Sequence, residues 1–135
     1  MSPHRSYSYS VERERRRELA AQRVRDTTQP SVQAYYGVLS DVLASVVGQY
    51  VTREHTQLTE EISRLEGLLA SDPFEARDLS RSIASRVFGL RRLAEERHRA
   101  KIEAERAADQ LRIEQMKRAR AELELVWQQE LSSWE

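Results

Sequence analysis

The sequence predicts an all-α protein built around a long antiparallel, coiled-coil-like helical hairpin with a shorter helix before it. Charged residues make up 33% of the chain, whereas Gly numbers 4 and Pro 3, a composition typical of long helices. Large apolar residues recur at spacings of three and four, which is the period of one helix face. One strong reversal signal, Ser71-Asp72-Pro73, lies near the middle of the chain.

The reversal signal at residues 71–73 combines three local features. Asp72 can accept hydrogen bonds from the free N–H groups at the start of a helix, and Pro73 suits the first helical position. Glu75 follows Asp72 by three residues, as in a capping box. We therefore expect one helix to end at this point and a second to begin at Pro73. The second helix contains no further proline, so we expect it to run unbroken toward Trp134.

The chain divides into three expected parts. Residues 1–9 are expected to form a flexible N-terminal tail, and residues 10–29 a basic helix that ends in a kink. The kink is predicted from Pro30, because proline disfavours helix at the residue before it. Residues 30–135 would form the long hairpin, whose first arm would run unbroken from about residue 31 to residue 70.

A hairpin folded at residue 72 predicts a definite register, in which the numbers of paired residues add up to about 145. Near the turn, Ile62 would meet Ile83. Farther out, large side chains would face alanines: Tyr35, Leu39 and Val42 against Ala104, Ala107 and Ala108. Large residues opposite small ones allow close approach of two helices. The charges agree, because residues 32–72 carry a net charge of −4 and residues 73–113 one of +3.

The beginning of the first arm, residues 32–51, is apolar over too wide an arc for one partner helix. At ~100° per residue the arc spans roughly 220°, whereas one buried face needs about 100°. Exposed apolar surface of this extent marks an interface. We therefore expect a homo-oligomer, with a dimer of two hairpins favoured. The expected self-association residues are Tyr36, Leu39, Leu43, Val46, Val47 and Tyr50. In the alternative, the N-terminal helix covers this flank in a monomeric three-helix bundle.

A second apolar pattern lies at the end of the chain. Trp127, Leu131 and Trp134 are spaced at i, i+4 and i+7, which suits a helix that lies in the groove of a partner protein. The alternative is that these residues pack against Val11 and Leu19, in the same molecule or in a second copy.

No catalytic, cofactor-binding or metal site is expected from the sequence. One Glu-x-x-His pattern, Glu95 to His98, has the spacing used in di-iron helical bundles, but those sites need a second copy and two more glutamates. In the predicted register His55 lies far from His98, so no Ser-His-Asp set can be assembled. The glycines are isolated, and no phosphate-binding loop is present.

The N-terminal region favours a second type of partner. Residues 1–25 carry seven Arg and three Glu, a net charge of +4. The densest run is Arg13, Arg15, Arg16 and Arg17. A basic segment preceded by tyrosines can contact phosphate backbones and bases, so a nucleic-acid-associated helical protein is the alternative function. Interleaved glutamates and an equal number of acidic residues in the whole chain weaken this alternative.

The favoured function is a non-enzymatic helical oligomerisation, scaffold or adaptor module of a larger protein assembly. Protein partners are expected, and no membrane span is, because polar residues interrupt the most apolar stretch. The chain has no cysteine, which fits a reducing, intracellular compartment, and we expect a cytoplasmic location.

Overall fold

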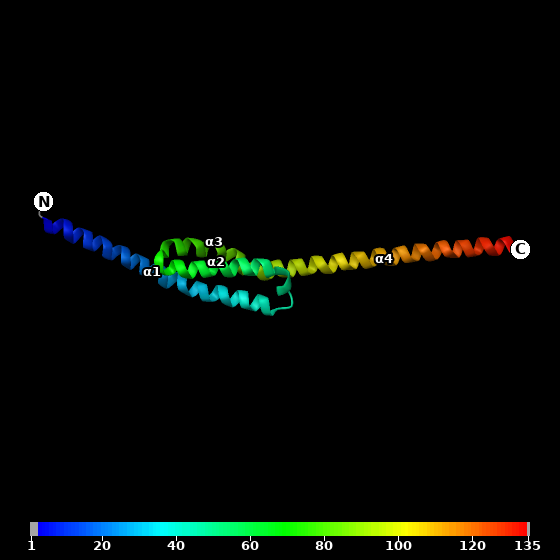
Figure 1. Ribbon diagram of the computed structural model, residues 1–135, viewed down its shortest axis with the longest axis horizontal. Helices are drawn as coiled ribbons and strands as arrows, with labels where there is room; N and C mark the ends of the chain where they lie inside the picture. The colour runs from blue at the N-terminus through cyan, green and yellow to red at the C-terminus, as the bar shows by residue number, and fades with distance from the viewer. Residues whose placement is uncertain (1–2, 135) are drawn as a thin grey trace. The chain divides into compact units, whose positions relative to one another are not determined.

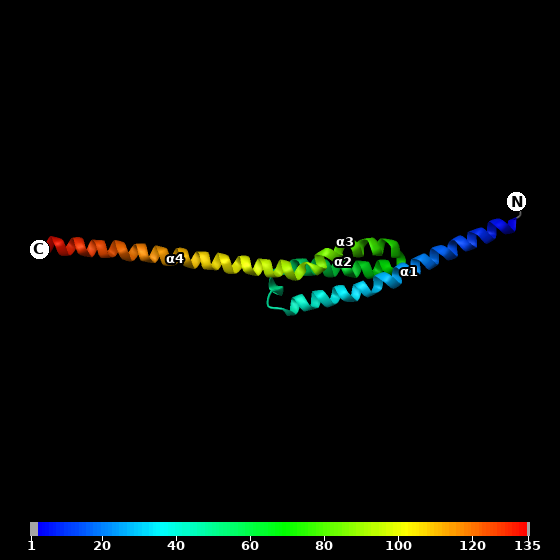
Figure 2. The same cartoon turned by 180° about the vertical axis from the view of Figure 1, so that it is seen from behind.

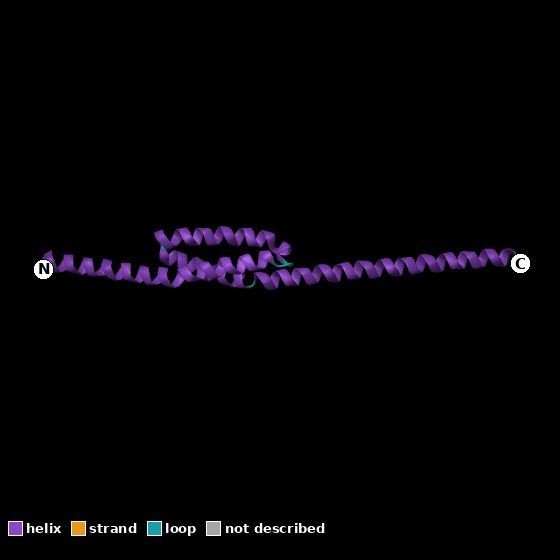
Figure 3. Cartoon of the chain, turned by 90° about the horizontal axis from the view of Figure 1, so that it is seen from below, coloured by secondary structure: helices purple, strands orange, loops and turns teal. Residues whose placement is uncertain are grey.

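A computed structural model describes the backbone of residues 3–134 and the side chains of residues 9–134 (Figure 1). Its elements are α1 (Pro3–Ala44), the short 3-10 helix η1 (Gly48–Val51), α2 (Thr52–Ser71), α3 (Pro73–Phe88) and α4 (Leu90–Trp134). No strand occurs among the described residues, and only short loops separate the helices (Figure 3). The all-α prediction is confirmed. The chain forms two compact units, residues 1–95 and residues 96–135, which we call the bundle and the C-terminal segment.

In the bundle, the second half of α1 lies beside α2 and α3 (Figures 1 and 2). The Arg25 guanidinium of α1 donates to the backbone oxygen of Leu69 near the end of α2, at 2.7 Å. Tyr36, farther along α1, donates to Glu66, so α1 and α2 run antiparallel. The chain then reverses again, which makes α3 antiparallel to α2: Arg64 pairs with Glu75 at 3.6 Å and Glu61 with Arg86 at 2.7 Å.

One continuous apolar core holds these helices together. Its aliphatic members meet along the axis of the bundle, and most keep less than a few per cent of their surface exposed: Val32, Leu39, Val42, Val51, Leu58, Ile62, Leu65, Ala76, Ile83, Val87, Leu90 and Ala94. Tyr35 adds a hydroxyl group to the core, and this hydroxyl is hydrogen-bonded, with its oxygen 2.9 Å from Ser80 Oγ. The Tyr35 ring also packs edge-on against Phe88, with centroids 5.7 Å apart.

The first arm of the predicted hairpin is not one helix, and this expectation is wrong. Helix α1 ends at Ala44, and the chain reverses through η1 before α2 begins. Ser45 Oγ donates to the backbone oxygen of Val42 at 2.6 Å, and the Gly48 N–H donates to the backbone oxygen of Ser45 at 3.2 Å. A Cβ at Gly48 would lie 2.5 Å from the Val42 oxygen, so the turn requires glycine there.

This reversal changes which residues cover the wide apolar arc. Tyr35, Leu39 and Val42 pack against α2 and α3, and Tyr35 bonds to Ser80. The predicted pairing of these residues with residues 104–108 is therefore wrong. A wide arc can be covered by two helices of the same chain, whereas the predicted hairpin offered it only one.

Helix α1 also continues through Pro30, so residues 10–29 belong to the same helix as the residues that follow them, up to Ala44. Residues 3–9, expected as a flexible tail, belong to α1, whereas residues 1 and 2 lie outside the described part of the chain. Proline removes one helical hydrogen bond. Thr28 before it and Val32 after it are both buried on the same face, and this packing holds the helix on either side of Pro30.

The second arm is likewise interrupted, at Gly89 between α3 and α4. A Cβ there would lie 2.8 Å from the backbone oxygen of Ser85, which explains glycine at this position. The interruption is a single residue, because the Leu93 N–H already donates to the Gly89 oxygen at 3.0 Å.

The predicted helix boundary at Asp72 is confirmed. Asp72 Oδ1 accepts from the Glu75 N–H at 3.2 Å, and Pro73 is the first residue of α3. The second half of a capping box is absent, because the Asp72 N–H donates to the Leu68 oxygen and the Glu75 carboxylate pairs with Arg64.

Replacing Asp72 by alanine should lower the free energy of unfolding of the bundle by about 1 kcal/mol, since an N-terminal N–H of α3 loses its acceptor. Asp72→Asn is the matched control, because asparagine caps equally well. Urea denaturation followed by circular dichroism measures both. Equal destabilisation by the two variants would contradict a capping role.

Candidate protein-association surface

The described part of the C-terminal segment, residues 96–134, belongs to one helix, α4, and its side chains from residue 103 to residue 134 are all exposed. Large apolar residues stand among them with about half or more of their surface free: Leu111, Ile113, Met116, Leu123, Leu125, Val126, Trp127, Leu131 and Trp134. Trp134 is 87% exposed. These exposed apolar side chains make the helix a candidate surface for protein association.

Most of these residues share one face. Ile113, Met116, Leu123, Trp127, Leu131 and Trp134 fall within an arc of about 80° at ~100° per residue, and we call them the C-terminal stripe. In a heptad written abcdefg, positions a and d form a helix–helix seam. Here a is occupied by Ile113, Arg120, Trp127 and Trp134, and d by Met116, Leu123 and Glu130. Leu131 flanks the seam at position e.

The stripe begins where an earlier apolar face ends. Ala100, Ala104, Ala107 and Leu111 lie on the opposite side of the same helix, as the phase change near residue 113 predicts from the spacing. That earlier face consists mainly of alanines, so the larger apolar side chains are concentrated in the C-terminal stripe.

Of the six residues expected to mediate self-association, some are buried in the bundle and others are exposed. Leu39 is only 2% exposed and belongs to the core. Tyr36, Val47 and Tyr50 are half-buried, and the first two pack against that core. Leu43 and Val46 remain exposed, at 54% and 85%. The predicted set therefore serves partly to hold the bundle together, and two of its six members form free apolar surface.

Tyr36 has a polar role that its helical spacing did not predict. Its hydroxyl donates to Glu66 Oε1 across the α1–α2 seam. This hydrogen bond, assisted by partial burial and by the negative charge of Glu66, raises the pKa of Tyr36 to about 12. Glu66 lies 30 residues from Tyr36 in sequence, so only the turn at residues 45–51 brings the two together.

The N-terminal arginines do not form one basic face. Arg13, Arg15, Arg16 and Arg17 are exposed on α1, but at ~100° per residue they spread over about 200° of its circumference. Arg25, in the same basic region, has a structural role: its guanidinium donates to the backbone oxygens of Leu69 and Ala70. These are carbonyls at the C-terminal end of α2, where a cation is favourable.

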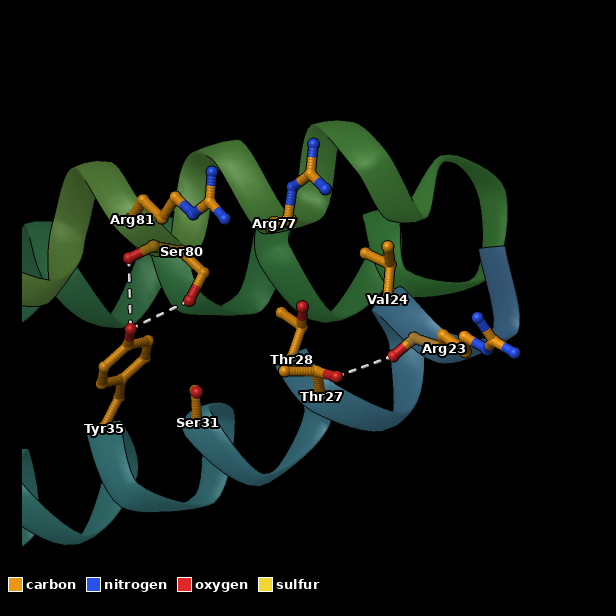
Figure 4. Close-up of a pocket in the computed structure, with 9 residues that line it drawn as sticks. All are labelled: Arg23, Val24, Thr27, Thr28, Ser31, Tyr35, Arg77, Ser80 and Arg81. Atoms are coloured by element: carbon orange, nitrogen blue, oxygen red, sulfur yellow. Dashed lines mark hydrogen bonds between the residues drawn. The ribbon is translucent and has the colours of Figure 1, made fainter. Parts of the chain in front are cut away.

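Three other arginines line a groove between α1 and α3, which has a volume of about 410 Å³. Figure 4 shows Thr28 and Ser31 directed from α1 toward α3, and the hydroxyl of Tyr35 bonded to Ser80. Arginines and hydroxyl-bearing residues make up most of the lining: Arg23, Val24, Thr27, Thr28, Ser31, Tyr35, Arg77, Ser80 and Arg81. No carboxylate is among these lining residues, but Arg77 pairs with Asp78 beside the groove, with Nε 3.7 Å from Oδ1.

Two other kinds of site are not found within the described residues. No group of three or more His, Cys, Asp or Glu side chains comes together in a way that could hold a metal ion there. None of the helices in this part of the chain is long and apolar enough to cross a membrane.

Comparison with known proteins finds no match for the chain. No protein-family model matches its sequence, and no curated protein and no solved structure matches the chain.

Tyr36→Phe should lower the free energy of unfolding by about 1 kcal/mol near pH 8, through loss of the hydrogen bond to Glu66. The pKa of about 12 in the folded state lies above the unfolded value near 10. The contribution is therefore complete below pH 10 and is lost as the pH rises from 10 to 12. Urea denaturation across this range should show the two proteins converging. Glu66→Gln keeps an acceptor and is the control; a difference that is constant with pH contradicts the linkage.

Proposed function

We propose that this protein is a non-enzymatic helical assembly module, a scaffold or adaptor whose C-terminal segment associates with another helix. The observation that carries the proposal is the C-terminal stripe, an apolar seam at heptad spacing on a helix with exposed side chains. The bundle then serves as a compact, independently packed unit to which this helix is joined.

The energetics support association through this stripe. An apolar side chain the size of Leu contributes about 1.5–3 kcal/mol when it is fully buried. Six such side chains supply on the order of 10 kcal/mol, which is similar to the estimated cost of association of about 4–15 kcal/mol. A partner helix that adds apolar side chains of its own makes the balance favourable.

The bundle supports association less well. Its wide apolar arc is largely covered within the chain, and of the six residues predicted there Leu43 and Val46 are exposed. Scattered exposed apolar residues are common on monomeric proteins and need no partner. We therefore assign the protein-binding role to Trp127, Leu131 and Trp134 together with the rest of the C-terminal stripe.

The full chain is expected to have a molar mass above the monomer value of 15.7 kDa at micromolar concentration, as measured by light scattering. Leu123→Gln combined with Trp127→Gln should return the mass to that of the monomer, because it removes two a/d residues. Leu125→Gln is the matched control, since Leu125 is 58% exposed but lies outside the stripe.

Two results would contradict this role of the stripe. One is a wild-type chain that stays monomeric at micromolar concentration and binds no other protein. The other is equal dissociation by the stripe variant and the Leu125 control. Circular dichroism must show unchanged helix content in both variants, so that the loss of association is not a loss of fold.

A second candidate function, nucleic-acid binding, is supported by the groove between α1 and α3. Arg23, Arg77 and Arg81 line this groove together with hydroxyl-bearing residues, and Arg77 pairs with Asp78 at 3.7 Å. Arg77 and Arg81 are one helical turn apart on α3. Such an arrangement favours phosphate groups, and its contribution would be strongest at low salt.

Labelled single-stranded and duplex oligonucleotides test this candidate by fluorescence anisotropy at low and moderate salt. Arg77→Gln combined with Arg81→Gln should weaken binding and reduce the salt dependence, since each lost phosphate contact lowers the slope by about 0.9 on duplex DNA. Arg118→Gln, on the C-terminal segment, is the control. Absence of binding at low salt would remove this candidate.

A further inference from the structure

We propose that the partner of the C-terminal stripe is the same stripe of a second copy, in antiparallel orientation, with Arg120 of each copy opposite Glu130 of the other. This inference rests on the proposed association function and adds to it the partner, the orientation and the register. It is carried by two charged residues that interrupt an otherwise apolar seam.

Arg120 and Glu130 occupy seam positions a and d, where the other residues are Ile113, Met116, Leu123 and the two tryptophans. Both side chains are exposed, and neither has an ion pair within the described part of the chain. They are ten residues apart, which is about 15 Å along a helix, so they cannot pair with each other in one copy. A partner helix that covers the stripe must therefore place groups of opposite charge against both Arg120 and Glu130.

A parallel pair of identical helices in register would place like charges opposite each other. In that arrangement each a or d residue faces the same residue of the other helix. Arg120 would face Arg120 and Glu130 would face Glu130, so both polar layers of the seam would hold like charges. Like charges in a partly desolvated seam oppose association.

An antiparallel pair would place opposite charges against each other, because position a of one helix then faces position d of the other. When Arg120 faces Glu130, the same register places Trp127 opposite Leu123 and Trp134 opposite Met116. Every layer occurs twice by symmetry. The six layers formed by Met116, Arg120, Leu123, Trp127, Glu130 and Trp134 are then either an apolar pair or an ion pair of opposite charge, and Ile113 lies beyond the last layer.

The charges also select one antiparallel register. A shift of one heptad would put Glu130 opposite Ile113 and Arg120 opposite Leu123, which leaves both charges against apolar side chains. A buried polar residue at a seam position is a recognised means of fixing register and orientation. Glu124 lies near its own copy in the proposed pair, but at the exposed rim, where repulsion is weak and screened.

The two charges provide a direct test of orientation. Arg120→Glu or Glu130→Arg alone creates like-charged layers in the antiparallel pair and should weaken dimerisation by about tenfold or more. The double variant Arg120→Glu with Glu130→Arg restores opposite charges and should dimerise as the wild type does. In a parallel pair, each single change leaves like charges facing like, so association would not change. Sedimentation equilibrium of the full chain measures the dissociation constants of the wild type and of these three variants.

Disulfide trapping supplies an independent test, because the chain has no cysteine of its own. Ala119 and Ser133 are exposed at position g beside the seam, and the proposed register places one beside the other across the two copies. A mixture of Ala119→Cys and Ser133→Cys chains should form a mixed disulfide under mild oxidation. Ser133→Cys alone should not cross-link, because its two copies would be about 24 Å apart along the axis.

The outcomes separate this inference from the function on which it rests. A wild-type chain that stays monomeric and binds no other protein through the C-terminal stripe overturns both. Association with rapid cross-linking of Ser133→Cys to itself, or with no response to single charge reversal, overturns the antiparallel register and leaves the assembly function in place. Association that occurs only with a different protein, while the chain alone stays monomeric, overturns the second copy as the partner.

Discussion

The apolar face of α1 formed by Val32, Tyr35, Leu39 and Val42 is the constraint on which the rest of the bundle depends. It is too wide to be covered by a single helix, so α2 and α3 pack on it from two directions. That requirement places the reversal at Ser45–Val51, and the reversal in turn brings Glu66 to Tyr36 and the end of α2 to Arg25. The polar contacts result from the packing of the apolar face.

The C-terminal segment presents the opposite situation. It carries apolar side chains as large as those of the core, yet its side chains from residue 103 to residue 134 are exposed. In the bundle, helices of the same chain bury the apolar face of α1. The apolar side chains of the stripe from Ile113 to Trp134 are exposed instead. This contrast between the two units directs the functional proposal to the C-terminal segment.

The candidate site was partly predictable, because its signal is local. Trp127, Leu131 and Trp134 stand out from their spacing alone, and the structure adds that they are exposed. Their role in binding stays a prediction. The six residues expected to mediate self-association were chosen from the same kind of spacing, but Leu39 is in the core. Periodicity identifies an apolar face and does not say whether the same chain or another covers it.

The sequence by itself determined the helical class, the boundary at Asp72 and the position of the C-terminal stripe, because capping and periodicity act over a few residues. Only the tertiary structure decided that α1 continues through Pro30, that the chain turns at Gly48, and that Tyr35 meets Ser80. Gly48 was a visible signal for that turn, but isolated glycines also occur within helices. These outcomes depend on burial shared between residues far apart in the chain, and such burial outweighs the local cost of a proline or a turn.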